Sequence, residues 1–283
     1  MYDSDDKPAV GQSVVGEVEE SWVAPSTRKG FLKGAAVAGV GAASVGGLSP
    51  AAAFAKAKKK GVTRNDLAIL KAAQIAEALA VTTYTNIINL APFFKNLPDD
   101  DQGYLKAAVN EEMSHYLLEE SLTKKPTPFT MFYYPPTMFT DAQTTLNILV
   151  TLEDAFIAAY LIGVRNFSTP DLRVTAARIM GIESDHRTLA RVLGPDVASA
   201  DGGPLSTITG IQKSAESVDP PNNNGYERTL GLSHISQAVE ALLPFAEKAA
   251  AEKAGFDTTK PYQFVPFTPV LADPLGEFHS LKG

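Results

Sequence analysis

The chain has 283 residues, a formal net charge of −7 and 45% hydrophobic residues, which is the composition of an ordinary globular protein with a substantial core. The excess of acidic residues argues against a nucleic-acid partner, because binding to phosphates requires a basic surface. The sequence contains no cysteine. This excludes disulfides, thiolate metal sites and iron–sulfur clusters.

The first 55 residues differ from the rest of the chain. Residues 1–25 are acidic and show no periodic pattern, so we predict that they are disordered. A basic start around Arg28, a weakly apolar Gly/Ala run over 34–48 and the small-x-small triplet Ala53-Phe54-Ala55 follow. This order is typical of a secretory signal cleaved after Ala55, and the apolar run is too short for a permanent membrane span. A flexible Gly/Ala tail is the alternative interpretation.

Four stretches with apolar residues at helical spacing come next, over about 63–91, 98–123, 141–167 and 170–193. Short loops join the first pair and the second pair. The connection from Lys124 to Thr140 contains four prolines, so no helix crosses it. The pattern predicts an all-α four-helix bundle with a long crossover between its second and third helices. Nothing alternates with period two, so we predict no sheet.

The C-terminal region continues with a loop over 196–224, which includes a predicted short helix at 205–217. A fifth helix is expected over 226–254, kinked at Pro244. The proline-rich tail from Phe256 should lie extended against the bundle or a neighbouring subunit. We therefore divide the chain into a leader (1–55), a bundle (56–195) and a C-terminal region that packs on the bundle (196–283).

Each of the four predicted bundle helices carries a glutamate among apolar residues, and two of them carry a histidine three residues later. The set is Glu77, Glu112, His115, Glu153, Glu183 and His186. Residues three apart share a helix face, so each Glu-x-x-His pair can bind one ion. Four buried carboxylates without compensation would be prohibitively costly, whereas two divalent cations cancel their charge. The pattern thus predicts a dinuclear metal site; ion pairs on the surface of an ordinary bundle are the alternative.

Two tyrosines repeat at the same offset from these glutamates. Tyr84 follows Glu77 by seven residues, and Tyr160 follows Glu153 by seven. Seven residues make nearly two helical turns, so each tyrosine should share a face with the glutamate of its own helix. We treat Tyr84 and Tyr160 as candidate catalytic residues beside the metals, with core packing as the alternative.

Several neighbouring groups leave the ligand set open. Glu111 is also within helical reach of His115, but the repeat favours Glu112. Glu119 shares the face of Glu112; we interpret it as a solvated charge near the helix end, with a role as a seventh ligand or beside the ligands as the alternative. Four other residues are interpreted as surface, ligand-flanking or structural groups: Asp154, Asp185, His234 and His279.

These motifs resemble the ferritin-like superfamily of ferritins, bacterioferritins, rubrerythrins and other di-iron carboxylate proteins, over about residues 63–193. The resemblance implies that the six residues bind two iron ions, with manganese as the alternative, and that Glu112 and Glu183 or their partners bridge them. The proline-rich crossover and extra C-terminal segment resemble the group that includes plant desiccation-related proteins. The leader resembles a twin-arginine signal, although Lys29 replaces its second arginine.

The resulting hypothesis is a protein exported to the periplasm, cell envelope or exterior. Its partners would be metal ions and oxygen or peroxide, and a homo-oligomer is compatible with the sequence. It would oxidise Fe(II) or reduce oxygen or peroxide in stress protection; with manganese, catalase-like chemistry becomes available. One alternative is a non-catalytic stress or desiccation-related protein whose metals stabilise the bundle. Another is an iron-storing cage, which the extra helix, tail and export signal argue against.

Overall fold

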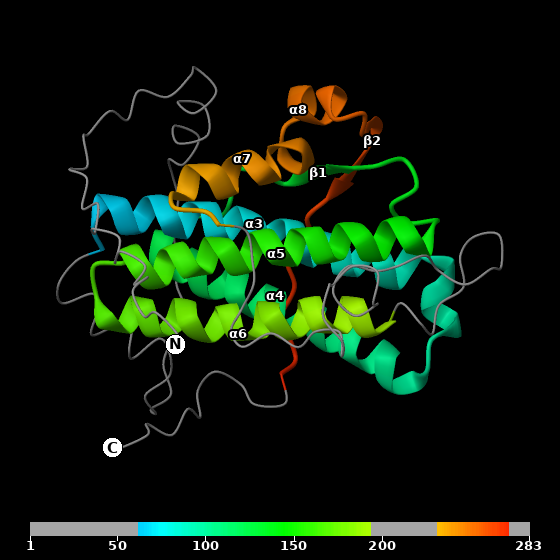
Figure 1. Ribbon diagram of the computed structural model, residues 1–283, viewed down its shortest axis with the longest axis horizontal. Coiled ribbons are helices and arrows are strands. Elements are labelled where there is room, and N and C mark those ends of the chain that lie inside the picture. The colour runs from blue at the N-terminus through cyan, green and yellow to red at the C-terminus, as the bar shows by residue number, and fades with distance from the viewer. Residues whose placement is uncertain (1–61, 194–230, 272–283) are drawn as a thin grey trace, which may run out of the picture. The chain divides into compact units, whose positions relative to one another are not determined.

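The computed structural model describes residues 62–193 and 231–271, all within one unit, Ala35–Gly283 (Figure 1). The predicted leader, the predicted short helix at 205–217 and His279 lie outside the described residues. Four long helices dominate: α3 (Arg64–Leu90), α4 (Asp99–Thr123), α5 (Ala142–Asn166) and α6 (Pro170–Leu193). A short 3-10 helix, η1 (Pro92–Asn96), connects the first two. The predicted all-α bundle is therefore confirmed.

The helices begin where local sequence can satisfy their free backbone amides. Thr63 and Asp66 form a capping box at the start of α3. The Asp141 side chain accepts the amide three residues on, and so does the Thr169 hydroxyl at the start of α6. Helix α4 starts with three aspartates, which suit the positive end of the helix dipole, and ends at Lys124 in a left-handed conformation with φ of 62°.

Two long-range hydrogen bonds fix the directions of the helices. The Gln74 amide, in the first half of α3, donates to the Lys125 carbonyl just beyond the end of α4 (2.8 Å). The Asn65 amide, also at the start of α3, donates to the carbonyl of Asn166 at the end of α5 (3.3 Å). The chain therefore leaves α4 at the end of the bundle where α5 finishes, and must return about 40 Å before α5 can begin. This is the predicted crossover.

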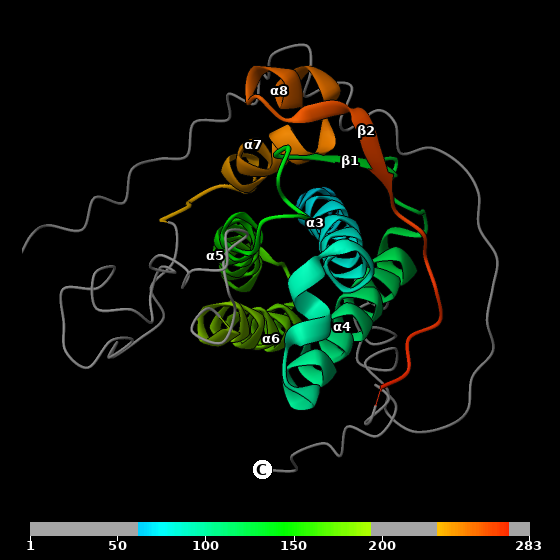
Figure 2. The same ribbon diagram turned by 90° about the vertical axis from the view of Figure 1, so that its right-hand side faces the viewer.

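Viewed end-on, the four helices form a two-by-two arrangement (Figure 2). Helix α3 packs against α4 and α5, and α6 packs against the same two helices from the other side. Helix α7 (Ile235–Ala246) covers α3 and α5 from outside. Helices α3 and α5 are long and apolar enough to cross a membrane, but 83% and 67% of their most apolar windows are buried in the protein interior. Their apolar character is accounted for by the core.

One buried carboxylate joins the start of α3 to the turn between α5 and α6. Asp66 is fully buried and accepts hydrogen bonds from the amide and hydroxyl of Thr63 at 2.9 and 2.7 Å. It also accepts from the Ser168 amide at 2.8 Å and the Ser168 hydroxyl at 2.5 Å. Burial alone would raise the pKa of Asp66, but these four donors outweigh it and lower the pKa.

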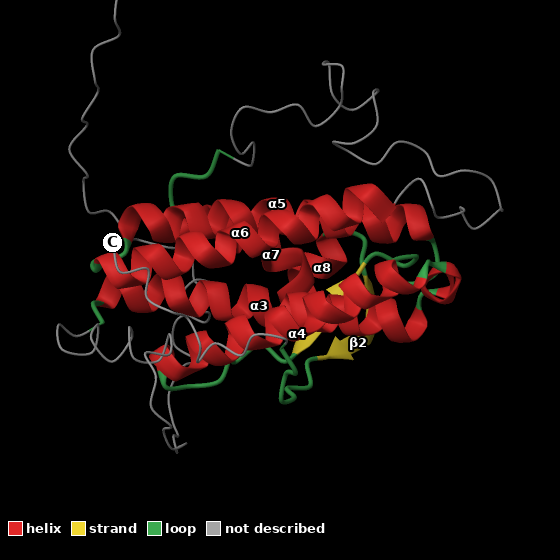
Figure 3. Ribbon diagram, turned by 90° about the horizontal axis from the view of Figure 1, so that it is seen from below, coloured by secondary structure: helices red, strands yellow, loops and turns green. Residues whose placement is uncertain are grey.

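The prediction that no sheet forms was wrong. Strand β1 (Met131–Tyr134), in the crossover, pairs antiparallel with β2 (Asp257–Gln263), and these two strands make up the sheet in the described part of the chain (Figure 3). Phe132 and Tyr134 are buried, while Met131 and Tyr133 are more exposed. All four residues of β1 are nevertheless apolar or aromatic, so burial alternates without any alternation of polarity in the sequence.

The predicted fifth helix is divided in two. Helix α7 contains Pro244 and ends two residues later; α8 (Lys248–Lys253) starts after Glu247, whose φ of −118° and ψ of 124° are extended. A proline cannot donate the usual backbone hydrogen bond, which weakens the helix locally. The chain therefore breaks near Pro244 instead of bending, and the Phe245 ring packs on Tyr134 (5.9 Å between centroids).

The C-terminal tail follows the outside of α4, as an extended segment. The Phe264 amide donates to the carbonyl of Thr130 (2.9 Å), and the Phe264 ring packs on Tyr116 of α4 (4.7 Å between centroids). The Val270 amide donates to Asn110 Oδ1 (2.8 Å). Within the described part of the tail, Phe264 and Val270 therefore both contact α4.

Candidate metal centre

The six residues singled out by spacing meet inside the bundle, where each of the four long helices contributes one glutamate. The glutamates are 0–2% exposed, and His115 and His186 are 8% and 3% exposed. Their ligand atoms fall into two groups, each within 4.8 Å: Glu77, Glu112, His115 and Glu183 in one, and Glu112, Glu153, Glu183 and His186 in the other. The alternative of surface ion pairs is therefore wrong.

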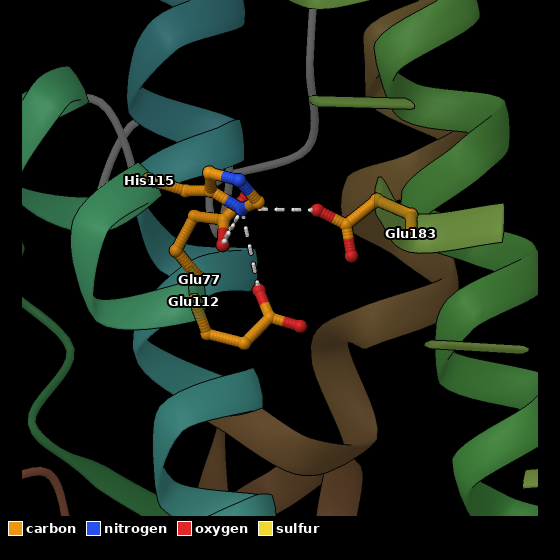
Figure 4. A group of neighbouring side chains, drawn as sticks. All are labelled: Glu77, Glu112, His115 and Glu183. Atoms are coloured by element: carbon orange, nitrogen blue, oxygen red, sulfur yellow. Dashed lines mark ion pairs between the residues drawn. The ribbon is translucent and has the colours of Figure 1, made fainter. Parts of the chain in front are cut away.

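The first group surrounds His115 (Figure 4). Its Nδ1 atom lies 3.3 Å from Glu183 Oε1, 3.5 Å from Glu77 Oε2 and 3.7 Å from Glu112 Oε2. Three carboxylate oxygens from three helices thus converge on one imidazole nitrogen. These separations are wider than most direct hydrogen bonds, and they suit atoms that share a common ion.

The second group surrounds His186. Its Nδ1 atom lies 2.9 Å from Glu112 Oε1 and 3.5 Å from Glu183 Oε2. Glu153 completes the group from α5. In the first group, α4 supplies the histidine and α3 the glutamate that belongs to that group alone. In the second group, α6 supplies the histidine and α5 the glutamate that belongs to that group alone.

Glu112 and Glu183 belong to both groups, and each divides its two oxygens between the histidines. Glu112 presents Oε2 to His115 and Oε1 to His186, while Glu183 presents Oε1 to His115 and Oε2 to His186. Glu77 and Glu153 each belong to one group only. The geometry therefore distinguishes two shared carboxylates from two terminal ones.

The carboxylates repel one another and attract positive charge. Burial, followed by repulsion from the shared carboxylates, raises the pKa of Glu77 and Glu153 well above the ordinary value. Burial acts in the same direction on Glu112, but the charge of His186 and the close approach of both imidazoles lower its pKa well below the usual range. Burial would lower the pKa of His115 and His186, yet the facing carboxylates raise it. The cluster thus favours cations, either protons on imidazole or metal ions.

The donor set fits a pair of divalent metal ions. Eight buried nitrogen and oxygen atoms of these six residues have no hydrogen-bond partner among the described residues: Glu77 Oε2, both oxygens of Glu112 and Glu183, Glu153 Oε2, and Nδ1 of both histidines. Buried polar atoms without partners are rare and costly. Carboxylate and imidazole donors in this arrangement could hold metal ions, and two divalent cations would neutralise the four carboxylates.

The tyrosines lie at the cluster, but each contacts the glutamate of the other helix. The Tyr84 hydroxyl donates to Glu153 Oε1 (2.7 Å), and the Tyr160 hydroxyl donates to Glu77 Oε1. Helices α3 and α5 are antiparallel. An equal seven-residue offset from glutamate to tyrosine in both helices therefore brings each tyrosine opposite the glutamate of the other helix. The spacing predicted their shared face correctly and could not reveal this exchange.

Outside the six residues, Glu111 reaches the centre in an unexpected way. Considered from sequence only as a neighbour of His115, it instead places Oε2 2.9 Å from Nε2 of His186, on α6. This contact favours the proton on Nε2 and leaves Nδ1 free to bind an ion. Asp154, next to a terminal glutamate, pairs with Arg187 (2.7 Å) and ties α5 to α6 beside the cluster. No spacing within one helix could have revealed these contacts between helices.

Interpreting Glu119 as a solvated charge was wrong. Its side chain is 2% exposed, and it accepts a hydrogen bond from Tyr160 (2.8 Å). Its position seven residues after Glu112 was the signal that could have placed it in the interior. Asp185 and His234 are both exposed.

The comparisons agree with this geometry. Residues 33–194, more than half of the chain, match the ferritin-like domain family. The chain therefore belongs to that family. The match covers all four bundle helices and all six cluster residues, whereas α7, α8 and β2 lie beyond it. Neither a curated protein nor a solved structure matches the chain.

Proposed function

We propose that this chain binds two first-row divalent ions, iron in preference and manganese as the alternative, and uses them to oxidise Fe(II) or to reduce oxygen or peroxide. The observation that carries the proposal is the sharing of Glu112 and Glu183 between the two groups. Two carboxylates that each present one oxygen to either side would hold a pair of divalent ions next to each other.

Each proposed ion has a terminal carboxylate and an imidazole of its own. Glu77 and His115 would hold one ion, Glu153 and His186 the other, with the shared glutamates between them. Ligands of this mixed oxygen and nitrogen type suit Fe(II) and Mn(II). A bound pair of such ions supplies two electrons to oxygen or peroxide.

The tyrosines hold protons beside the terminal carboxylates. Burial, with the nearby carboxylates, raises the pKa of both Tyr84 and Tyr160 well above the ordinary value, so both stay protonated at neutral pH. Each hydroxyl can then donate to the terminal glutamate opposite and fix the orientation of that carboxylate. Their proposed role is to position Glu153 and Glu77 and to keep a proton within one hydrogen bond of each.

We propose the same activity as the basis of stress protection outside the cytoplasm, with export through the twin-arginine-like segment. Support comes from the sequence of residues 26–55 alone. N-terminal sequencing of the protein purified from its native host tests this directly. A mature chain starting at Lys56 supports export; an intact chain in the cytoplasmic fraction contradicts it.

Oxygen consumption by the Fe(II)-loaded chain tests the proposed chemistry. The wild type should oxidise Fe(II) with uptake of oxygen or peroxide, and Glu112→Ala should lose this activity while keeping its helical content. Asp185→Asn is the matched control, because Asp185 is an exposed carboxylate on the same helix as Glu183. Equal activity in Glu112→Ala and Asp185→Asn would refute the proposal.

A second candidate is a non-catalytic role in which the ions hold the bundle together. The eight partnerless polar atoms favour it, because metal binding to the folded state alone stabilises that state. This role predicts a large fall in melting temperature on chelation and no turnover with oxygen or peroxide. The oxygen assay above separates the two candidates.

A further inference from the structure

Helix α4 supplies two of the six cluster residues, Glu112 and His115. Its neighbours in the bundle hold it unevenly, because α4 packs closely on α3 but only sparsely on α6. A metal centre needs its ligand atoms held to within about 0.5 Å of the binding geometry. A helix turn that is supported mainly from one side can shift by more than this, so the turn with Glu112 and His115 needs a further support.

A segment outside the bundle is in place to give that support. Residues 264–271, which we call the strap, leave strand β2 and run over the outer face of α4, as the red trace beside α4 in Figure 2. Strand β2 is paired with β1, with Gln263 opposite Met131, so the strap starts from a fixed point. The strap lies beyond residues 33–194, the part of the chain that matches the ferritin-like domain family. Any effect of the strap on the centre is therefore an addition to that domain.

The strap contacts α4 at two residues, one on each side of the cluster residues. The Phe264 ring packs on Tyr116, with 4.7 Å between the ring centroids. The Val270 amide donates to Asn110 Oδ1 at 2.8 Å. Tyr116 directly follows the cluster histidine of α4, and Asn110 precedes the cluster glutamate by two residues. Both cluster residues of α4 therefore lie within the stretch that the strap spans.

The aromatic contact is buried and tied to the crossover between α4 and α5. Tyr116 is 2% exposed and Phe264 is 4% exposed. The Tyr116 hydroxyl accepts a hydrogen bond from the Thr127 amide at 3.2 Å, and the Phe264 amide donates to the Thr130 carbonyl at 2.9 Å. The two rings are thus held in place by the backbone of the crossover.

The polar contact is fixed by the helix itself. Asn110 Nδ2 donates to the Lys106 carbonyl one turn earlier at 2.7 Å, which directs Oδ1 toward the Val270 amide. Met113 is three residues from both Asn110 and Tyr116, so the three share one face of α4. Met113 is 0% exposed. This face of α4 is therefore closed to solvent at the level of the cluster.

We propose that the strap positions the metal centre, with Phe264 and Asn110 as positioning residues that act on the ions through α4. The proposal rests on the proposed function, because it concerns the same pair of ions. Two contacts, one at each end of the turn, oppose both its rotation about the helix axis and its movement away from the centre.

Glu112 is the residue whose orientation depends most on this support. Its Oε2 must face His115 while its Oε1 faces His186. A small rotation of the turn would direct one of these oxygens away from its ion. Because Glu112 is shared between the two groups, loss of the strap should weaken the binding of both ions.

Hydrogen–deuterium exchange of the metal-free full chain tests the proposal without any ion. Phe264→Ala should speed exchange of the backbone amides of residues 111–116 about tenfold. Val265→Ala is the matched control, because Val265 is the next residue of the strap and is 64% exposed, and it should exchange as the wild type does. The amides of α5 around Glu153 should keep their wild-type rate. Equal acceleration in α5, or none at residues 111–116, would overturn the proposal.

Two further variants keep the test decisive if Phe264→Ala folds poorly. Asn110→Ala removes the other contact at a partly exposed position and should speed exchange of the same amides. Alanine is the better helix former, so helix propensity alone would slow that exchange. Phe264→Leu keeps much of the buried apolar volume and should restore most of the protection. Wild-type exchange in Asn110→Ala, or no restoration in Phe264→Leu, would contradict the role of the strap.

Binding of Co(II) separates positioning from a general support of the fold. The visible absorption of Co(II) depends on the geometry of its ligands, so the spectra are compared at full occupancy. Phe264→Ala should raise the dissociation constants of both ions about tenfold and shift the absorption bands. Phe264→Leu should return both toward the wild type, and Val265→Ala should change neither. Unshifted bands and unchanged dissociation constants in Phe264→Ala would overturn the proposal.

The outcomes also separate this proposal from the proposed function. A wild type that binds no Co(II) contradicts the proposed function, while exchange at residues 111–116 still tests the strap. A second outcome is a wild type that binds two Co(II) ions and oxidises Fe(II), with Phe264→Ala and Val265→Ala alike in exchange, affinity and spectrum. That result would refute the role of the strap and leave the metal chemistry standing.

Discussion

Metal binding should stabilise the folded chain by an amount that depends on which ligand is removed. With free metal at one hundred times the dissociation constant, each position contributes about 2.7 kcal/mol. Two positions give the wild type about 5 kcal/mol, which corresponds to an increase in melting temperature of roughly 10–20 °C. Glu77→Ala removes a proposed ligand of one of the two metal-binding positions, so this variant should keep about half of the metal-dependent increase in melting temperature. Glu112→Ala removes a ligand of both and should keep little of it.

Thermal unfolding with and without Mn(II), followed by circular dichroism, measures these increments. The comparison uses the increase on adding metal, because removing a buried carboxylate also relieves repulsion in the metal-free protein. Asp185→Asn should show the full wild-type increase. Equal increments in Glu77→Ala and Glu112→Ala would refute the reasoning, because they would mean that Glu112 serves one ion only.

Three further predictions follow from contacts elsewhere in the structure. Asp66→Asn should lower stability at pH 7 by about 2–3 kcal/mol, because a hydrogen-bonded carboxylate is lost; the loss should vanish in acid. Glu111→Ala should weaken metal binding at the His186 position about 10–100-fold and leave the other position unchanged, as isothermal titration calorimetry would show. Gly163→Ala should cost about 1–3 kcal/mol in urea unfolding, because its Cβ would lie 2.8 Å from Phe167 Cε2.

The sign of the pH effect at Asp66 follows from its lowered pKa in the folded state. The stabilisation is present above the ordinary pKa of 3.8 and is lost as the pH falls through the lower folded value. Urea unfolding of the wild type and Asp66→Asn should therefore converge below that pH. A difference in unfolding free energy between the wild type and Asp66→Asn that stays constant from pH 7 down to pH 2 would contradict this account of Asp66.

For Glu111→Ala, the contradicting result would be an equal loss of metal affinity at both binding positions.

Spacing within single helices predicted most of the bundle and the six residues that form its buried Glu/His cluster. The caps at Thr63 and Asp141, and the three-residue spacing of Glu112 and His115, are local features whose geometry a helix determines by itself. Charge balance then required the four glutamates to share one site. The structure places all of them in two overlapping groups.

What the sequence could not predict depends on how the helices face one another. The exchange of tyrosine partners follows from the antiparallel contact of α3 and α5, and the contact of Glu111 with His186 depends on α4 and α6. The pairing of β1 with β2 joins segments far apart in the chain, and β1 lacks a polar alternation. Glu119 was misjudged because its place near the end of a helix was given more weight than its face.

Anomalous diffraction from crystals of the chain loaded anaerobically with Fe(II) tests the central claim most directly. The account predicts two iron peaks about 3.5–4 Å apart, one beside Glu77 and His115 and one beside Glu153 and His186, with both shared glutamates between them. A single peak, or none within the cluster after Fe(II) loading, would contradict it.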